Sequence, residues 1–325
     1  MFKKMLPILL VVAMLLSFAG SALADAKKVY FIVKASESEF WQIVIDGGRM
    51  AAEELGVEFI DQAAPQESDV AKQVAILETA IGDKPDAIVL APTVEDALVP
   101  GIEKAIDEGI PMIIIDSSAN TDKYTSFLAS DNVKIGELSA DMMAEALTKR
   151  FGKPEGKVAA LTFMSGVGSL EKRQKGFLDT IAAKYPGIEI VDVQDAQGKQ
   201  GTSIAIVQNF ITTYPDLNGI YCNNQITGDE AVRALDMAGK KDLALVAVDA
   251  GPQEVWGLEN GFTDYIIVQK PWVMGHMGVE YALKAATGEK LDKFIDTGIV
   301  AISPEMMKSG EALEFLDPVK FYHEK

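Results

Sequence analysis

The clearest indication of the fold is the stretch "DAIVLAPTVEDALVPGIEKAIDEGIPMIIID", residues 86–116. It contains two short apolar runs, DAIVLA (86–91) and PMIIID (111–116), separated by a helix-length segment over 94–108. Runs with so few polar residues are typical of strands buried on both faces, and strands joined through a helix run parallel. The stretch therefore predicts a parallel sheet with helices on both faces.

The same alternation precedes this stretch. The runs KVYFIV (28–33) and VEFID (57–61) predict two further strands. Amphipathic segments predict helices over 41–55, which Gly56 ends, and over 68–82. The first half of the chain therefore alternates strands and helices in the order expected for a parallel sheet.

The second half repeats this order. Strand one to strand two spans about 30 residues in both halves, and strand three to strand four about 25. The predicted strands cover 157–163, 188–193, 219–223 and 243–249, with helices near 169–184, 202–213 and 228–238. Because residue identity between the halves is low, we expect a repeat of structure rather than a recent duplication of sequence. The fold class is α/β, with two similar doubly wound parallel-sheet, Rossmann-like domains.

The first residues are typical of a secretory signal peptide. Lys3 and Lys4 precede the apolar run 5–20, and the small residues of ALA follow. This pattern predicts that residues 1–24 are cleaved after Ala24 and that the protein is periplasmic. The run is short for a retained anchor, and no cysteine near the site offers a lipid attachment point.

Length and charge limit the remaining choices. The full chain of 325 residues has a formal net charge of −18, and loss of the two signal-peptide lysines makes it about −20. An acidic chain repels phosphate backbones, so we expect no nucleic-acid partner. About 300 mature residues exceed what one core usually supports, so two domains are expected.

Signatures of catalysis are weak, and we predict no enzyme, no cofactor and no metal. The segment SGVGSLEKRQKG (165–176) lacks the third glycine of a dinucleotide-binding loop, and neither G-x-S-x-G nor H-E-x-x-H is present. Cys222 lies in an apolar run and is expected to be a buried strand residue. His276 and His323 lie far from the predicted strand ends. No dense Asp/Asn loop typical of calcium sites occurs.

Ligands of open parallel sheets bind outside the carboxyl ends of the strands. The residues that follow strands one and four, and their counterparts in the second half, combine aromatic, carboxylate, amide and basic side chains: Lys34, Ser38, Phe40, Trp41, Asp116, Ser117, Arg173, Asn224 and Asp249. Carboxylates and amides form paired hydrogen bonds with adjacent hydroxyls, and an aromatic face packs on the C–H face of a sugar ring. This set favours a polyhydroxylated ligand held between the domains.

Each of these residues also has a simpler interpretation. Asp116 and Asp249 are alternatively caps of the turns that follow them. Phe40 and Trp41 are alternatively the first buried turn of a helix, and Arg173 an ordinary surface residue of a helix. The matching positions of the two aspartates in the two halves favour the binding interpretation.

The chain resembles the type I periplasmic substrate-binding proteins of ABC importers, in the ribose-binding-like sugar branch. The resemblance covers about 28–300 and rests on EFWQIVIDGGRMAAEELG, DAIVLAPT, GIPMIIIDS, LASDNVKIGE, RQKGF, GDEAVRAL and VAVDAG. It implies two domains joined by a three-segment hinge. The first comprises 25–130 plus 270–296, and the second 131–269 plus 297–325.

The resemblance also implies ligand contacts from both domains. The first domain would supply Lys34, Ser38, the stacking pair Phe40 and Trp41, and Asp116, which takes two ring hydroxyls. The second would supply Arg173, Asn224, Asp249 and, at a crossover, Gln269.

Two departures from the ribose-type pattern leave the identity of the ligand undetermined. Ser117 stands where ribose-type proteins have an arginine, and AQGKQ (196–200) stands where a second aromatic is usual. Lys34 offers positive charge elsewhere. A monosaccharide other than ribose, a polyol, a furanosyl signalling molecule and an anionic sugar all stay open.

The function implied is capture of a small carbohydrate by hinge closure and delivery to an ABC importer permease, with no covalent chemistry. The protein is expected to act as a monomer. The alternative is a ligand-sensing protein that partners a chemoreceptor or a sensor kinase.

Overall fold

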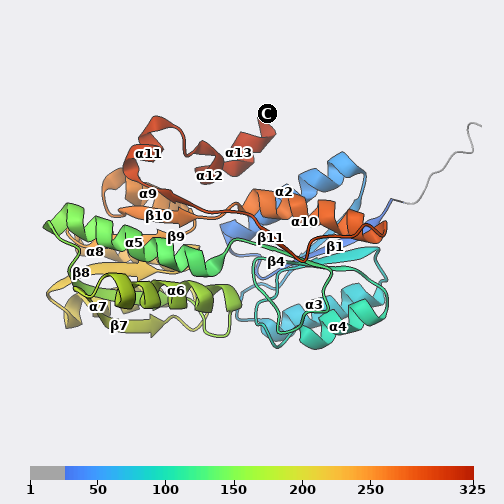
Figure 1. The fold of residues 1–325 in the computed structure, drawn as a ribbon, viewed down its shortest axis with the longest axis horizontal. Coiled ribbons are helices and arrows are strands. Elements are labelled where there is room, and N and C mark those ends of the chain that lie inside the picture. Colours follow the sequence, from blue (N-terminus) through green and yellow to red (C-terminus); the bar gives the residue numbers. More distant parts are fainter. Residues whose placement is uncertain (1–25) are drawn as a thin grey trace, which may run out of the picture.

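Two sheets lie side by side, and helices cover both faces of each (Figure 1). The computed structural model describes residues 26–325. The expected signal peptide, 1–24, lies outside the described residues. Within the described chain, no helix is both long and apolar enough to cross a bilayer.

The first sheet has the strand order β11-β5-β4-β3-β1-β2, and every neighbouring pair is parallel. Its strands are β1 (Lys28–Val33), β2 (Glu58–Ala63), β3 (Ala87–Leu90), β4 (Met112–Ile115), β5 (Ser126–Ala129) and β11 (Phe294–Asp296). We call this sheet and the helices packed on it the first unit.

The second sheet repeats this arrangement in the order β12-β10-β9-β8-β6-β7. Its strands are β6 (Gly156–Thr162), β7 (Ile188–Asp195), β8 (Leu217–Cys222), β9 (Ala244–Val248), β10 (Tyr265–Val268) and β12 (Val300–Ile302). Only the pair of β10 with β12 is antiparallel. This sheet and its helices form the second unit.

The strand orders confirm the predicted pair of doubly wound α/β domains. Counted within its own unit, each sheet runs 2-1-3-4-5, which is the doubly wound order of flavodoxin-like proteins. The sequence analysis identified the four strands nearest the start of each unit and missed the strands at the other edge, β5 with β11 and β10 with β12. The strands β11 and β12 have only three residues each, too few for a hydrophobic period. The strands β5 and β10 come after the four strands whose spacing repeats between the halves.

The helices complete the layers. In the first unit, α2 (Glu39–Leu55) and α10 (Pro271–Ala286) cover one face, and α3 (Val70–Gly82) and α4 (Val99–Asp107) the other. In the second unit, α5 (Asn132–Phe151) and α6 (Gly168–Lys184) cover one face. The helices α7 (Thr202–Thr213), α8 (Gln225–Ala238) and α9 (Pro252–Asn260) cover the other face.

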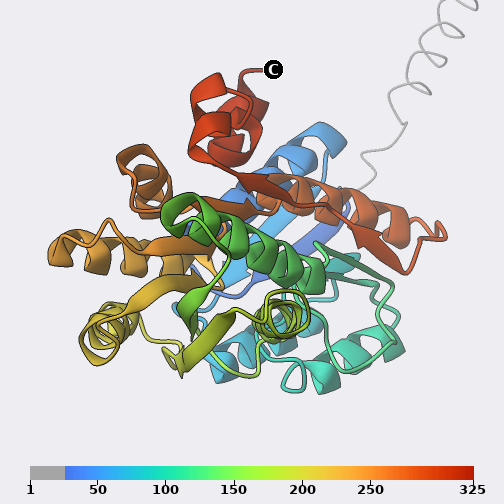
Figure 2. The ribbon, with the colours of Figure 1, turned by 60° about the vertical axis from the view of Figure 1, so that its left-hand side comes forward.

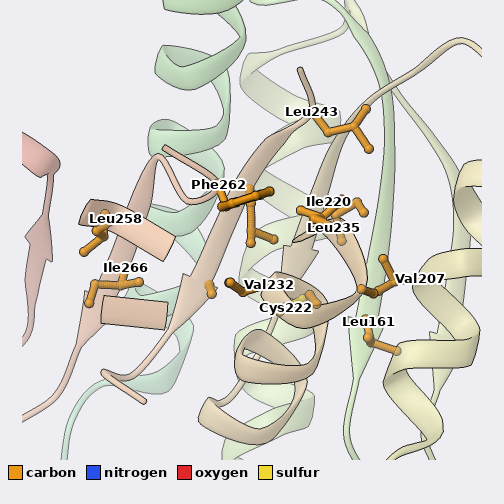
Figure 3. Packing of buried hydrophobic residues seen from close by; sticks show 14 of the residues in the cluster. Leu161, Val207, Ile220, Cys222, Val232, Leu235, Leu243, Leu258, Phe262 and Ile266 are labelled. Atoms are coloured by element: carbon orange, nitrogen blue, oxygen red, sulfur yellow. The ribbon is translucent and has the colours of Figure 1, made fainter. Parts of the chain in front are cut away.

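The alternation of side chains along each strand produces two cores per unit. In β1, Phe31 packs under α2 and α10, whereas its neighbour Ile32 packs under α3 and α4. Figure 3 shows the corresponding cluster of the second unit, in which Cys222 lies among apolar side chains. Burial of each large apolar side chain contributes about 1.5–3 kcal/mol, so strands apolar on both faces require helices on both faces. Cys222 is a buried strand residue, as expected, and burial raises the pKa of its thiol.

The chain passes between the units three times. It crosses after Ala129, returns after Val268 and crosses again after Asp296. Consequently α5 packs on strands of the second unit and α10 on strands of the first. Three short segments thus join the two units.

The C-terminal segment contacts both units. It forms α11 (Pro304–Ser309), α12 (Leu313–Leu316) and α13 (Pro318–His323), which lie across the top of the molecule (Figures 1 and 2). Phe315 of α12 packs on the core of the second unit. In α13, the Tyr322 ring stacks on Trp272 of the first unit at 4.0 Å between centroids. His323 Nε2 lies 2.9 Å from Asp46 Oδ2 of α2. The last helix therefore docks on the first unit.

Deletion of residues 318–325 is expected to lower the melting temperature by about 3–6 °C. The deletion removes an aromatic stack and the partly exposed contact of His323 with Asp46, together about 1–2 kcal/mol. The Tyr322→Phe variant keeps the stack and loses only the hydroxyl bond to Glu314, so it should melt within about 1 °C of the parent. Differential scanning calorimetry measures both. An unchanged melting temperature after the deletion would show that the docking of α13 contributes no stability.

Candidate functional site

The carboxyl ends of strands from both units meet at one cavity. Its atoms leave about 320 Å³ of empty space, part of which is open to solvent. Its walls come from β1, β4 and the start of α2 in the first unit, and from α6, β8, β9 and β10 in the second. The lining residues are Lys34, Ser38, Phe40, Trp41, Glu67, Asp116, Ser169, Leu170, Arg173, Asn224, Gln225, Asp249 and Gln269.

Nine of the ten site residues expected from the sequence line this cavity. The tenth, Ser117, lies directly behind the wall. Its hydroxyl accepts a hydrogen bond from Lys34 Nζ at 2.7 Å and lies 2.9 Å from both Asp116 Oδ2 and Ser169 Oγ. Neither histidine lines the cavity: His276 contacts Glu54, and His323 contacts Asp46.

Lys34 and Asp116 form a buried ion pair in the first unit. Lys34 Nζ lies 2.7 Å from Asp116 Oδ2, and both side chains are at most 3% exposed. Burial acts to raise the pKa of Asp116, but Lys34 and Arg173 together hold it below its ordinary value. Asp116 is therefore an ionised hydrogen-bond acceptor at neutral pH. Lys34 supplies here the positive charge that the resemblance leads one to expect from an arginine at position 117.

The aromatic pair belongs to a core and also lines the cavity. The helix α2 begins at Glu39, so Phe40 and Trp41 occupy its first turn, and both belong to the core of the first unit. They also line the cavity. Their rings meet edge to face at 5.0 Å, and the Lys34 ammonium lies 5.4 Å from the centre of the Trp41 ring. The core thus fixes a rigid aromatic wall.

The two aspartates occupy matching and unusual backbone positions. Asp116 follows β4 with φ 63°, and Asp249 follows β9 with φ 85°. Left-handed conformations cost energy in residues other than glycine and are concentrated at functional sites. Within the described chain, neither carboxylate accepts a bond from the backbone of the turn that follows it. The Asp249 carboxylate accepts bonds from Gln269 Nε2 at 2.8 Å and from the backbone N of Gln225, the first residue of α8, at 3.3 Å. The capping alternative is wrong for both.

Arg173 is not a surface residue. It is 2% exposed, and its guanidinium donates to Asn132 Oδ1 at 2.8 Å and to the carbonyl of Asn223 at 3.0 Å. Its Nη1 also lies 3.6 Å from Asp249 Oδ2. Burial raises the pKa of Asp249 despite this neighbour, so the second aspartate is shifted in the opposite direction from Asp116.

Two amides differ in how much of their capacity the protein uses. Asn224 is the N-cap of α8, and its side-chain oxygen accepts bonds from the backbone N and the hydroxyl of Thr227. Only the Asn224 amide nitrogen is therefore left for a ligand. Gln269 donates to Asp249, while its oxygen is buried with no hydrogen-bond partner among the described residues. An unpaired buried acceptor costs free energy, which a bound donor would restore.

Four of the lining residues are not among the ten expected site residues: Glu67, Ser169, Leu170 and Gln225. Gln225 directly follows Asn224, and its oxygen accepts bonds from Ser38 Oγ at 2.9 Å and Phe40 N at 3.0 Å across the cavity. Glu67 lies in the loop after β2, and the strand-end rule applied to that strand would have found it. Ser169 and Leu170 have no signal of their own in the sequence.

The second unit contributes no aromatic side chain to the cavity lining. The resemblance leads one to expect a second aromatic residue near 196–200. There, Ala196 is fully buried in a small apolar cluster, and the exposed Lys199 does not line the cavity. Leu170 is the apolar side chain that the second unit offers instead. The aromatic wall is one-sided.

Comparisons with known proteins agree with this architecture. Residues 29–290 match the family described as periplasmic binding protein domain. The ribose import binding protein of Escherichia coli is 29% identical over 283 residues, which cover 87% of this chain and 93% of that protein.

Two solved structures are similar over most of their length. A carbohydrate transporter solute binding protein from Agrobacterium radiobacter, in complex with D-arabinose, is 34% identical with a TM-score of 0.88, and the match covers 90% of this chain and all of that one. An ABC transporter solute binding protein from Agrobacterium vitis with bound D-fucose is 35% identical with a TM-score of 0.83, covering 89% and 99%. The chain therefore belongs to the periplasmic binding protein family, as its resemblance to the type I, ribose-binding-like members predicts.

Proposed function

We propose that this protein captures a monosaccharide or a closely related polyhydroxylated molecule in the cavity between its units and delivers it to the permease of an ABC importer. The single observation that carries the proposal is the cavity itself, in which a rigid aromatic wall faces buried carboxylates, amides and cations from both units. An aromatic face excludes water from one side of a sugar ring, and charged groups hold its hydroxyls at the edges.

The proposed ligand is a single sugar ring rather than a chain of them. The relatives compared above include proteins whose ligands are D-arabinose and D-fucose, both single-ring sugars. The ten expected site residues, Ser117 included, are those we propose to surround the ligand. Lys34, Asp116, Arg173 and Asp249 supply charged hydrogen bonds, and a ligand that lacks a matching hydroxyl would leave one of them unpaired.

Hinge closure is the proposed mechanism. The two bodies that move would be 25–130 with 270–296 and 131–269 with 297–325, except that α13 would move with α2, on which it docks. Direct contacts already join the units across the cavity, among them Gln225 to Ser38 and Ser117 to Ser169. A ligand that touches both bodies binds the closed state more tightly and shifts the equilibrium toward it.

The remaining proposals follow from this function. Residues 1–24 would direct export to the periplasm and be cleaved after Ala24. The protein would act as a monomer because one chain supplies every wall of the cavity. It would release its ligand chemically unchanged. The relatives named above are import and transport proteins, so import is preferred over partnership with a chemoreceptor or sensor kinase.

A thermal-shift screen against pentoses, hexoses and polyols, together with sugar acids, tests the proposal. A ligand at 100 times its Kd stabilises the native state by about 2.7 kcal/mol, which should raise the melting temperature by about 5 °C or more. Chromatography of the released ligand should recover it unaltered. If no carbohydrate raises the melting temperature, or if the sugar is converted to a product, the proposed function is wrong.

A further inference from the structure

Glu67 is a buried acidic residue that faces the cavity. It lies in the loop between β2 and α3, is 6% exposed, and lines the cavity beside Trp41. Its Oε1 accepts a hydrogen bond from the Trp41 indole nitrogen at 2.8 Å. A carboxylate is rarely buried this deeply without an ionic partner.

The cations of the cavity are already engaged. Lys34 lies 2.7 Å from Asp116, and Arg173 is held by Asn132, Asn223 and, at 3.6 Å, Asp249. No basic nitrogen of the described residues lies within 4.0 Å of the Glu67 carboxylate. The charged residues of the lining are therefore two paired cations, their two aspartate partners, and Glu67, which has no cation of the described residues within 4.0 Å. Burial raises the pKa of the Glu67 carboxyl, although Lys34 and Arg173 act to lower it.

The second carboxylate oxygen of Glu67 has no protein donor. The only hydrogen bond that the carboxylate makes with the described residues is the one from Trp41 to Oε1. Oε2 is also absent from the fully buried, unpaired atoms of the described chain, so it is not fully buried, and Glu67 lines the cavity. An acceptor in this position is satisfied by a ligand that brings a hydroxyl, and it repels a ligand that brings a second negative charge.

We propose that Glu67 is a specificity-determining residue: its Oε2 accepts a hydrogen bond from a hydroxyl of a neutral carbohydrate, and its unmatched charge excludes anionic ones. This inference rests on the proposed function and narrows it, because it removes sugar acids and sugar phosphates from the possible ligands. The ligand would lie with one face on Trp41 and one hydroxyl toward Glu67.

The test compares a matched pair of ligands. The best neutral hexose from the thermal-shift screen is titrated calorimetrically beside the uronic acid of the same stereochemistry. The parent protein should bind the neutral sugar at least about 100-fold more tightly, because an extra carboxylate would be buried near one that has no counter-ion. Equal or tighter binding of the acid would overturn the proposal and leave carbohydrate binding intact.

The Glu67→Gln variant separates the charge from the shape. Glutamine keeps an oxygen that can accept the Trp41 bond, so a purely structural role predicts no change. The proposal instead predicts about three- to thirtyfold weaker binding of the neutral sugar and at least tenfold less discrimination against the acid. An unchanged ratio of the two affinities would show that Glu67 does not determine specificity.

Two further variants complete the design. Glu37→Gln removes the same charge from an exposed residue that does not line the cavity, and both affinities should stay within about twofold of the parent. Glu67→Asp keeps the charge on a shorter side chain, so it should still exclude the acid while binding the neutral sugar more weakly. Loss of the exclusion in Glu67→Asp would contradict the electrostatic argument even if Glu67→Gln fails to fold. Failure of every carbohydrate to bind the parent would instead count against the proposed function.

Discussion

The Asp116→Asn protein is expected to bind its carbohydrate at least about 100-fold more weakly than the parent and to lose the ligand-induced thermal shift. Asp116 is an ionised acceptor at the carboxyl end of β4, where Lys34 holds its pKa low against the effect of burial. Each hydrogen bond to a charged group contributes about 1.5–3 kcal/mol, and two ring hydroxyls are expected to share this carboxylate. Their loss amounts to at least about 3 kcal/mol.

Asparagine is the informative substitution at this position. An alanine would leave the Lys34 ammonium buried without its partner, a change that costs about 3–5 kcal/mol and would confuse binding with folding. Asparagine keeps an oxygen near Lys34 and tolerates the left-handed backbone at φ 63° better than alanine does.

Isothermal titration with the sugar identified in the screen measures the loss of affinity. The matched control is Asp122→Asn, which makes the same change at an exposed residue of the segment between β4 and β5. It should bind like the parent. If Asp116→Asn binds within about threefold of the parent while the control is unaffected, the carboxylate does not hold the ligand hydroxyls.

A single methyl group added at a helix crossing is expected to have the largest effect on stability. In the second unit, a Cβ on Gly136 of α5 would lie 2.1 Å from the carbonyl oxygen of Arg173 in α6. In the first unit, a Cβ on Gly275 of α10 would lie 1.9 Å from the carbonyl oxygen of Val44 in α2. Backbone atoms cannot yield as flexible side chains do, so each helix pair would have to separate.

Gly136→Ala and Gly275→Ala should each lower the free energy of unfolding by about 3 kcal/mol, even though alanine favours the helical state by about 1 kcal/mol. Each change should also weaken ligand binding, because α6 carries Arg173 and α2 carries the aromatic wall. Urea denaturation gives the stability. Gly82→Ala, at the end of α3 where a Cβ meets nothing within 4 Å, is the control and should be neutral or slightly stabilising. Wild-type stability in both crossing variants would show that the helices have room to adjust.

The architecture could be predicted because its signals are local. Strands such as KVYFIV (28–33) are apolar on both faces, and the helices between them have one apolar face, so the layers follow from the pattern. Because the spacings between strands repeat in the second half of the chain, a second unit of the same fold could be predicted as well. The edge strands and the docking of α13 escaped prediction because pairing with distant segments, rather than local pattern, decides where such short pieces lie.

Most of the cavity lining could also be predicted, because strand ends in a parallel sheet meet at one edge. The degree to which these side chains are buried could not be predicted. The sequence left open whether Arg173 lies on the surface and whether Phe40 and Trp41 belong to the core or to a binding wall. In the structure Arg173 is buried. The two aromatic residues belong to the core and also line the cavity. Glu67 was not predicted because it lies in the loop after β2, away from the strand ends on which the prediction of the site rested.

The sequence by itself determined the two doubly wound units, the family and most of the side chains of the cavity, since these depend on periodicity, on strand ends and on motifs within short segments. Only the tertiary structure decided how the charges pair. Lys34 and Asp116 lie 82 positions apart along the chain, yet their charged atoms are 2.7 Å apart, whereas Glu67 has no cation of the described residues within 4.0 Å. Ionic interactions in a buried site depend on distances of a few ångströms between segments remote in sequence, and folding alone sets those distances.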